Sequence, residues 1–390
     1  MTDFLSLADD TTGAIEVTAK FISAGIPAIT ALHALDSGAD WPAGAVVVDC
    51  QTRHATSQET YRTIAELARR GREQRIPSLY VKTDSTLRGN IAQTFEALLD
   101  VYPERALIYV PAYPAMRRTV SKGILLVDGR PLAETEFDTD RPQSVPESCI
   151  CQLLKNTCCR LVESVGDANT LDARLATGAA GSIFVCDGAT EQDIASIGAV
   201  LWRYREVHLA AGTGGFAGYW IRSQMECTGG LLPISLTDPF LVICGSLNPV
   251  SSGQLQRAGI PSFTLGADEE GDVALAADVL NSTDWTIVQT PRQSLSAGSE
   301  IKRRIAALVK RVVESGKLRG LVVFGGDTAR AVLDTLGVRS LRTHYELLTG
   351  IPLSSFHYRK SELLLVTKAG GFGSPTVLCD IQEKLAERKT

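Results

Sequence analysis

The first half of the chain alternates short apolar runs with longer segments of helical periodicity. Six runs have the length and apolar content of buried strands, and each ends in a polar or a glycine- or proline-containing turn. These runs are residues 4–10, 45–50, 79–84, 106–112, 182–188 and 207–212. Strands that alternate with helices predict right-handed βαβ crossovers and a mainly parallel sheet. In such a sheet, ligands bind at the carboxyl ends of the strands.

Glycine-rich turns interrupt this pattern around residues 213–235, and a second series of apolar runs follows. The later runs are residues 240–246, 261–265, 286–289, 320–326 and 363–371, with an amphipathic helix predicted from Ser299 to Ser315. A chain of 390 residues also exceeds what one hydrophobic core usually supports. We therefore predict two α/β domains, residues 1–230 and 235–390, each a mainly parallel sheet flanked by helices, with the active site in the cleft between them.

The composition argues against several classes of partner. The net charge is -5, and acids and bases are interspersed, so we expect neither a nucleic-acid-binding face nor a polybasic membrane anchor. No apolar segment approaches the ~20 residues of a membrane span, and the first residues lack the positive charge of a signal peptide. Of the nine cysteines, those at 50, 186 and 244 lie in apolar, strand-like runs, which is typical of reduced thiols in a cytoplasmic protein. Cysteines 149, 151, 158 and 159 lack zinc-site spacing, so no protein-held metal is predicted.

Two polar turns follow strands of the first half. The turn ADDTTGA (8–14) places Asp9 and Asp10 beside two hydroxyls at the start of a helix, where they could hold a polyol or supply a base. A helix cap with solvated acids explains this turn equally well. The turn KTDSTLRGN (82–90) combines Lys82 and Arg88, which suit a carboxylate ligand, with an acid and several hydroxyl side chains.

A proline-braced loop, PAYPAMRR (111–118), follows the fourth strand. It could present Arg118 to an anion, or it could be a rigid turn with solvated arginines, and the sequence does not decide between the two.

Three glycine-bearing turns follow strands of the second half, at residues 244–249, 324–329 and 368–373. Glycine lets backbone N–H groups approach phosphate oxygens, and a helix N-terminus adds a favourable dipole. The third turn contains Gly370 and Gly371. Neither a Walker-type loop nor the dinucleotide fingerprint occurs, so another kind of nucleotide site is indicated.

The order of these motifs resembles the four-carbon acid sugar kinase family. The matching segments are LADDTTGA, KTDSTLRGN, PAYPAMRRTV, GRPLAETEF, CGSLNP, FGGDTARAVLDTLG, LTGIPL and TKAGGFG, in this order from residue 7 to 373. The resemblance implies an N-terminal domain that binds the sugar acid and a C-terminal domain that binds ATP. On the substrate side it implies Asp10, Lys82, Asp84, Ser85 and Arg88. On the nucleotide side it implies Ser246, Gly325, Gly326, Asp327, Thr328 and Gly370. Three positions depart from the family pattern: Arg117 stands for a glycine, Ala369 for a serine and Asp138 for a small residue.

The mechanism expected from these residues is an in-line transfer of the γ-phosphoryl group of ATP. Lys82 and Arg88, with Arg118, would hold the substrate carboxylate, and Mg²⁺ would bridge the phosphates. Either Asp10 or Asp84 would accept the hydroxyl proton, with Asp327 as a further candidate. A sensor that binds sugar acid and ATP without turnover is an alternative, as is a sugar-acid aldolase or dehydratase, which would leave the glycine turns unexplained. The sequence leaves open the identity of the acid sugar and whether the chain forms a homo-oligomer.

Overall fold

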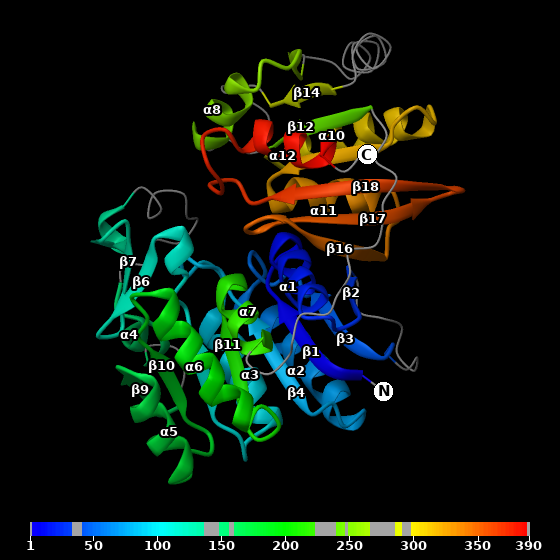
Figure 1. Cartoon of the computed structure of the whole chain (residues 1–390). Coiled ribbons are helices and arrows are strands. Elements are labelled where there is room, and N and C mark those ends of the chain that lie inside the picture. The colour runs from blue at the N-terminus through cyan, green and yellow to red at the C-terminus, as the bar shows by residue number, and fades with distance from the viewer. Residues whose placement is uncertain are drawn as a thin grey trace. The chain divides into compact units, whose positions relative to one another are not determined.

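The computed structural model describes residues 2–32, 41–135, 148–155, 160–222, 239–245, 249–265, 285–290 and 298–387. Within it, the chain forms two compact units, residues 1–229 and 230–390 (Figure 1). Each unit is an α/β structure with its own sheet, as the sequence predicted. No helix in these ranges is both long enough and apolar enough to span a bilayer.

The sheet of the first unit is parallel throughout its paired strands. In spatial order its strands are β2 (Ala28–Ala31), β3 (Gly44–Asp49), β1 (Thr2–Ala8), β4 (Ser78–Lys82), β11 (Leu209–Gly212), β5 (Leu107–Val110), β10 (Ile183–Cys186) and β9 (Val162–Val165). All six runs predicted from the first half are strands of this sheet. The register pairs Ala8 with Asp49 on one side and with Lys82 on the other. The carboxyl ends of β3, β1 and β4 are therefore adjacent.

The described helices of the first unit pack on one another in two groups. The helices are α1 (Thr11–Ser23), α2 (Ser57–Glu73), α3 (Ile91–Val101), α4 (Ile150–Lys155), α5 (Ala168–Ala176), α6 (Glu191–Tyr204) and α7 (Gly214–Arg222). Helix α7 packs on α1 and α6, whereas α2 packs on α3, as expected for helices that cover opposite faces of a parallel sheet. The hydrophobic core of the first unit includes the fully buried side chains of Phe95, Tyr109 and Phe216.

A small antiparallel sheet extends from the first unit and was not predicted from the sequence. It comprises β6 (Arg118–Ser121), β7 (Ile124–Val127) and β8 (Arg130–Pro131), flanked by short 3₁₀ turns η1 (Pro114–Met116) and η2 (Leu132–Glu134). Asp187, at the end of β10, accepts hydrogen bonds from the N–H groups of Lys122 (2.6 Å) and Gly123 (2.8 Å) in the β6–β7 turn. The carboxylate of Asp187 thus anchors this sheet.

Arg117, which departs from the family pattern, adopts the backbone conformation that glycine favours. Its φ is 57° and its ψ is 32°, in the left-handed region at the end of η1. We expect Arg117→Gly to change stability by less than about 1 kcal/mol, because relief of strain offsets the added chain entropy. Arg117→Val should cost about 1–2 kcal/mol more, because a β-branched residue fits this region poorly. Urea unfolding of both variants tests this, and equal stabilities would contradict it.

The second unit has a mixed sheet that is parallel over five of its strands. The order is β13 (Ser262–Thr264), β14 (Trp285–Gln289), β12 (Phe240–Cys244), β15 (Gly320–Phe324), β18 (Ser361–Lys368), β17 (Ile351–Tyr358) and β16 (Ser340–Leu348). Strands β16 and β17 form an antiparallel hairpin that pairs with β18 and was not predicted. The described helices are α8 (Pro249–Arg257), α10 (Gly298–Glu314), α11 (Gly326–Thr335) and α12 (Val377–Ala386). Helix α10 confirms the predicted amphipathic helix to within one residue at each end.

Candidate functional site

Arg53 lies at the centre of a cluster of charges at the carboxyl ends of β3, β1 and β4. Its guanidinium group donates two hydrogen bonds to Asp9, from Nε (2.8 Å) and Nη2 (2.9 Å). It also donates from Nη1 to Asp10 (2.7 Å), and Nη2 lies 3.6 Å from Oδ1 of Asp84. The side chain of Arg53 is only 12% exposed. One buried arginine therefore joins the acidic turn after β1 to the turn after β4.

Asp10 is the N-cap of α1, so the helix-cap interpretation of the ADDTTGA turn is correct for this residue. Its carboxylate accepts hydrogen bonds from the N–H of Gly13 (2.9 Å) and from the hydroxyl of Thr12 (2.9 Å). The acid is not solvated, because Asp10 is buried and paired with Arg53. The cap and the charged cluster therefore use the same side chain.

Asp84 is held more tightly than the other acids. Arg88 donates to both of its oxygens, from Nε (2.9 Å) and Nη2 (2.7 Å). Thr86 adds its N–H (3.0 Å) and its hydroxyl (2.6 Å). This bidentate pair fixes the 82–90 turn and leaves the Arg88 side chain 41% exposed.

The electrostatic environments of the three acids differ. Burial works to raise the pKa of each one. For Asp84 the positive charges of Arg88 and Arg53 outweigh burial and hold the pKa well below its usual value. Arg53 and Lys82 likewise lower the pKa of Asp10. For Asp9 burial wins, helped by the neighbouring charge of Asp10, and its pKa is raised.

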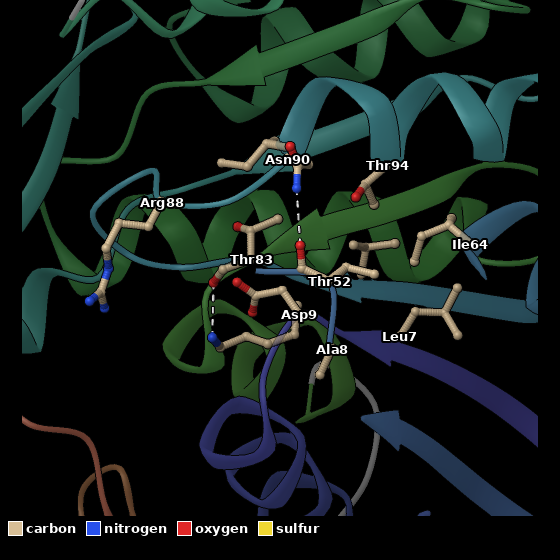
Figure 2. A pocket seen from close by; sticks show the side chains of 12 residues that line it. Leu7, Ala8, Asp9, Thr52, Ile64, Thr83, Arg88, Asn90 and Thr94 are labelled. Carbon is tan, nitrogen blue, oxygen red and sulfur yellow. Dashed lines mark hydrogen bonds between the residues drawn. The ribbon is translucent and has the colours of Figure 1, made fainter. Parts of the chain in front are cut away.

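A small pocket opens beside these charges (Figure 2). Figure 2 shows Arg88 at one end, Leu7 and Ile64 at the other, and Asp9 and Thr83 between them. Its lining residues are Leu7, Ala8, Asp9, Thr52, Ile64, Val81, Lys82, Thr83, Arg88, Asn90, Ile91 and Thr94. The pocket thus has a charged end and an apolar end.

Two further polar residues from the sequence analysis lie near this pocket. Lys82 is buried and donates from Nζ to the carbonyl of Thr83 (2.9 Å). A Cβ on Gly13 would lie 2.8 Å from Nζ of Lys82, so this ammonium also lies against the start of α1. Ser85 is half-buried in the same turn.

Arg118 is also buried. It donates to the carbonyl of Met116 (3.0 Å), and burial lowers its pKa, while the charges of Asp84 and Arg88 act on it. The interpretation of Arg118 as a solvated turn arginine is therefore wrong.

Arg53 is the residue of this cluster that sequence reasoning missed. It lies in the turn after β3, where Gln51 adopts a left-handed φ of 52° that helps to aim the chain toward β1. The N–H groups of Thr52 and Arg53 both bind the carbonyl of Asp9 (3.1 and 3.2 Å). Asp49, at the end of β3, accepts from the hydroxyl of Thr11 (2.5 Å) and fixes the turn from the other side. The one signal in the sequence was that this turn, like the turns after β1 and β4, directly follows an apolar run.

In the second unit the three predicted glycine turns lie side by side. Strands β12, β15 and β18 are adjacent, and their last residues pair in register. The N–H of Gly245 binds the carbonyl of Phe324 (3.3 Å), and the N–H of Gly325 binds that of Lys368 (2.8 Å). A Cβ on Gly245 would lie 1.9 Å from the hydroxyl oxygen of Thr328, so only glycine allows this approach.

Helix α11 begins at this edge without a side-chain cap. Its N-cap is Gly325, with φ 112° and ψ 124°, a conformation that side-chain-bearing residues rarely adopt. Because the N-cap is a glycine, it has no side chain that could accept a hydrogen bond from the first turn of α11. An uncapped helix N-terminus favours a phosphate group. The residues at this edge therefore fit the triphosphate of a nucleotide.

The remaining predicted residues of the second unit have different environments. Asp327 forms an ion pair with Lys302 of α10 (2.5 Å) and is 44% exposed. Gly370 and Gly371 lie in the turn after β18 and are half-buried. Ser246 lies outside the described residues, as does Asp138 of the first unit. In the described ranges, no three His, Cys, Asp or Glu side chains are grouped so that they could hold a metal ion.

Comparisons with protein families match both units. A model described as a sugar-binding N-terminal domain matches residues 4–220, and one described as a nucleotide-binding C-terminal domain matches residues 241–378.

Several relatives with curated names match over nearly their whole lengths. The chain is 29% identical to a D-threonate kinase of Bordetella bronchiseptica (98% of this chain, 97% of that protein). It is 26% identical to a 3-oxo-tetronate kinase of Methylobacterium radiotolerans (94% and 95%) and to a D-erythronate kinase of Heliobacterium modesticaldum (97% and 96%).

Solved structures share the fold. A crystal structure of a Salmonella typhimurium LT2 protein has a TM-score of 0.79 at 21% identity, with 99% of each chain covered. A Bordetella bronchiseptica protein of the family DUF1537, described as a domain-swapped dimer with bound citrate, is 26% identical with a TM-score of 0.52 over 100% of both chains.

Proposed function

The chain belongs to the family that joins a sugar-binding N-terminal domain to a nucleotide-binding C-terminal domain, and we propose that it is an ATP-dependent kinase of a four-carbon acid sugar. The observation that carries this proposal is the edge of the second unit, where three adjacent strands end in glycine turns beside an uncapped helix. The kinase names of the full-length relatives support it, and the resemblance seen in the sequence is confirmed.

The first unit binds the acid sugar in this proposal. Arg88, with Nε and Nη2 committed to Asp84, keeps Nη1 for the substrate carboxylate, and Lys82 adds positive charge. Arg53 orients the acids that bind the sugar hydroxyls. The fixed ion pairs mean that little reorganisation accompanies substrate binding.

The second unit binds ATP at Gly325, Gly326, Thr328, Gly370 and Gly371. Backbone N–H groups there contact the phosphates, and Ser246 stays a predicted contact. Mg²⁺ enters with ATP and neutralises the charge of its phosphates. Asp327 remains a candidate to contact the nucleotide or its metal, since its side chain is partly exposed.

Asp9 is the strongest candidate for the group that accepts the hydroxyl proton, ahead of Asp10 and Asp84. It lines the pocket, both of its carboxylate oxygens accept hydrogen bonds from Arg53, and its pKa is raised toward the range useful for a base. Asp84 already accepts from Arg88 and Thr86, and its depressed pKa makes it a poor proton acceptor. We assign Asp84 to orienting Arg88.

The three Asp→Asn variants distinguish these roles. Asp9→Asn should lower kcat by about 10²–10⁴-fold, with a smaller change in KM for the acid sugar. Asp84→Asn should mainly raise this KM, because Arg88 loses its bidentate partner. Steady-state kinetics of the three variants check this, and an Asp9→Asn enzyme with normal kcat would return the assignment to Asp10.

The activity is tested by ADP release with Mg-ATP and a panel of D- and L-threonate, D- and L-erythronate and 3-oxo-tetronates. We expect one strong responder, which also identifies the substrate. Silence across the panel while ATP still raises the melting temperature would overturn the four-carbon assignment. The non-catalytic sensor predicts that both ATP and the acid sugar raise the melting temperature without release of ADP.

Self-association and a cytoplasmic location stay predictions. The domain-swapped dimer described for the Bordetella bronchiseptica protein supports a homo-oligomer, which mass photometry of the purified chain tests.

A further inference from the structure

The loop after β18, residues 369–374, is held from one side by three buried side chains. Nζ of Lys368 donates to the carbonyls of Ala369 (3.0 Å), Gly370 (2.9 Å) and Phe372 (2.8 Å). Nε2 of Gln254 donates to those of Phe372 (2.9 Å), Gly373 (3.1 Å) and Ser374 (2.9 Å). The hydroxyl of Ser251 adds a bond to Gly370 (2.5 Å). Every carbonyl of the loop except that of Gly371 therefore accepts a bond from this set.

This arrangement determines where the N–H groups of the loop point. In a planar trans peptide, the C=O of one residue and the N–H of the next point in opposite directions. Because the carbonyls of Ala369 and Gly370 face the buried donors, the N–H groups of Gly370 and Gly371 face away from them. In the described part of the chain no residue accepts a hydrogen bond from either N–H. Both glycines are half-buried, so a ligand can reach them.

The three side chains are completely or almost completely buried. Lys368 and Ser251 are 0% exposed and Gln254 is 1% exposed. The ammonium of Lys368 also lies 4.5 Å from the ring centre of Phe324, at the end of β15. A lysine is rarely placed in such an interior unless its bonds serve a purpose, because desolvation of the ammonium is costly.

We propose that Lys368, Gln254 and Ser251 are positioning residues that hold the 369–374 loop so that the N–H groups of Gly370 and Gly371 bind the phosphates of the nucleotide. This inference rests on the proposed function and extends it to residues with no direct contact to ATP. Lys368 begins the 368–373 turn but points its side chain away from the proposed phosphate site, and Ser251 and Gln254 lie outside the three glycine turns.

Because the Lys368 ammonium holds this loop, nucleotide binding to the loop should be linked to protonation of Lys368. Burial lowers the pKa of Lys368 to about 7, and the electrostatic interaction with Cys244 on β12 opposes that effect. The side chains that surround the ammonium and the loop are uncharged: Phe324 on β15, and Ser251 and Gln254 on α8. A nucleotide anion bound to the loop stabilises the ammonium form. Nucleotide binding at pH 8 should therefore take up a proton at Lys368.

The test compares wild type with Lys368→Met and Ser251→Ala, and uses Lys384→Met as the control. Lys384 is a partly exposed lysine of α12, paired with Glu387 in the same unit. ADP binding is measured by calorimetry. This measurement needs no turnover, so it tests the loop even if the chain phosphorylates no acid sugar. We expect Lys368→Met to weaken ADP binding at least tenfold and Ser251→Ala about threefold, with unchanged acid-sugar binding. The Lys384→Met control should match wild type.

Proton uptake separates positioning from general loss of structure. Calorimetry at pH 8 in two buffers of different ionisation enthalpy gives the protons taken up with ADP. Wild type and Ser251→Ala should take up a fraction of a proton that is missing in Lys368→Met. A folded Lys368→Met protein with wild-type ADP affinity and wild-type proton uptake would overturn the proposal. If Lys368→Met does not fold, unchanged ADP affinity in Ser251→Ala and in Gln254→Leu would overturn it instead.

Discussion

Replacing Arg53 with methionine is expected to abolish measurable turnover and to destabilise the protein by about 3–5 kcal/mol. The change removes the shared partner of Asp9 and Asp10 and a nearby charge that acts on Asp84. Three buried carboxylates would then lie together with less compensating charge. Breaking a buried ion pair on one side is costly for this reason, whereas an exposed pair contributes at most ~1 kcal/mol. Arg174→Met is the matched control, because Arg174 is 54% exposed and forms a surface ion pair with Glu163.

The loss should depend on pH in a defined direction. In the wild type, Asp10 and Asp84 have lowered pKa values, so their stabilising effect is present above the unfolded pKa of about 3.9 and is lost as the pH falls through the folded values. Asp9 acts in the opposite sense, since its pKa is already raised. Without Arg53 all three pKa values rise, so the variant gains stability relative to wild type as the pH falls from 7.5 to 5. Urea unfolding across this range measures the difference, and a pH-independent difference would contradict the account.

Arg53→Lys helps to separate charge from geometry. Lysine keeps one positive charge but cannot bridge two carboxylates with a planar fork. We expect it to recover much of the stability and little of the turnover. Full recovery of turnover would mean that only the charge of Arg53 matters.

Replacing Gly325 with alanine is expected to weaken nucleotide binding at least 100-fold while acid-sugar binding is retained. The residue has φ 112° and ψ 124°, where a Cβ costs roughly 1–3 kcal/mol, and it is the N-cap that sets the direction of α11. Relief of this strain would tilt the first N–H groups of the helix away from the phosphates. Calorimetry with ADP and separately with the acid sugar measures both effects.

Gly337→Ala is the control for backbone strain alone. Gly337 has a left-handed φ of 69°, lies after the other end of α11, and has no atom within 4 Å of an added Cβ. We expect this variant to lose stability but to keep its affinity for ADP. Equal loss of affinity in the two variants would mean that general strain, not the geometry of the phosphate site, explains the effect.

The parts of the fold that the sequence predicted are those in which one physical signal dominates. Strands buried on both faces, such as Gly44–Asp49 and Gly320–Phe324, are continuous apolar runs and were found. The strand Ser340–Leu348 was missed because its exposed and buried residues alternate along much of its length, so it has no apolar run. The β6–β7–β8 sheet was missed because its strands are only two to four residues long.

The sequence predicted which residue types form the candidate site, but not which of these side chains contact one another. Strand ends supplied Asp9, Asp10, Lys82 and Asp84 as candidates because polar groups there follow apolar runs. Arg53 was missed because its role depends on β3 lying next to β1, and strand order cannot be read from the apolar pattern. The contrast between Asp9 and Asp84 depends on that same arginine, so no local motif could assign their roles.

The most direct test of the central claim is identification of the reaction product. Mass spectrometry of a mixture of the chain, Mg-ATP and the best acid sugar of the panel should show that sugar acid carrying one phosphoryl group, formed in equal amount to ADP. ADP accompanied by inorganic phosphate and an unmodified sugar acid would contradict a kinase.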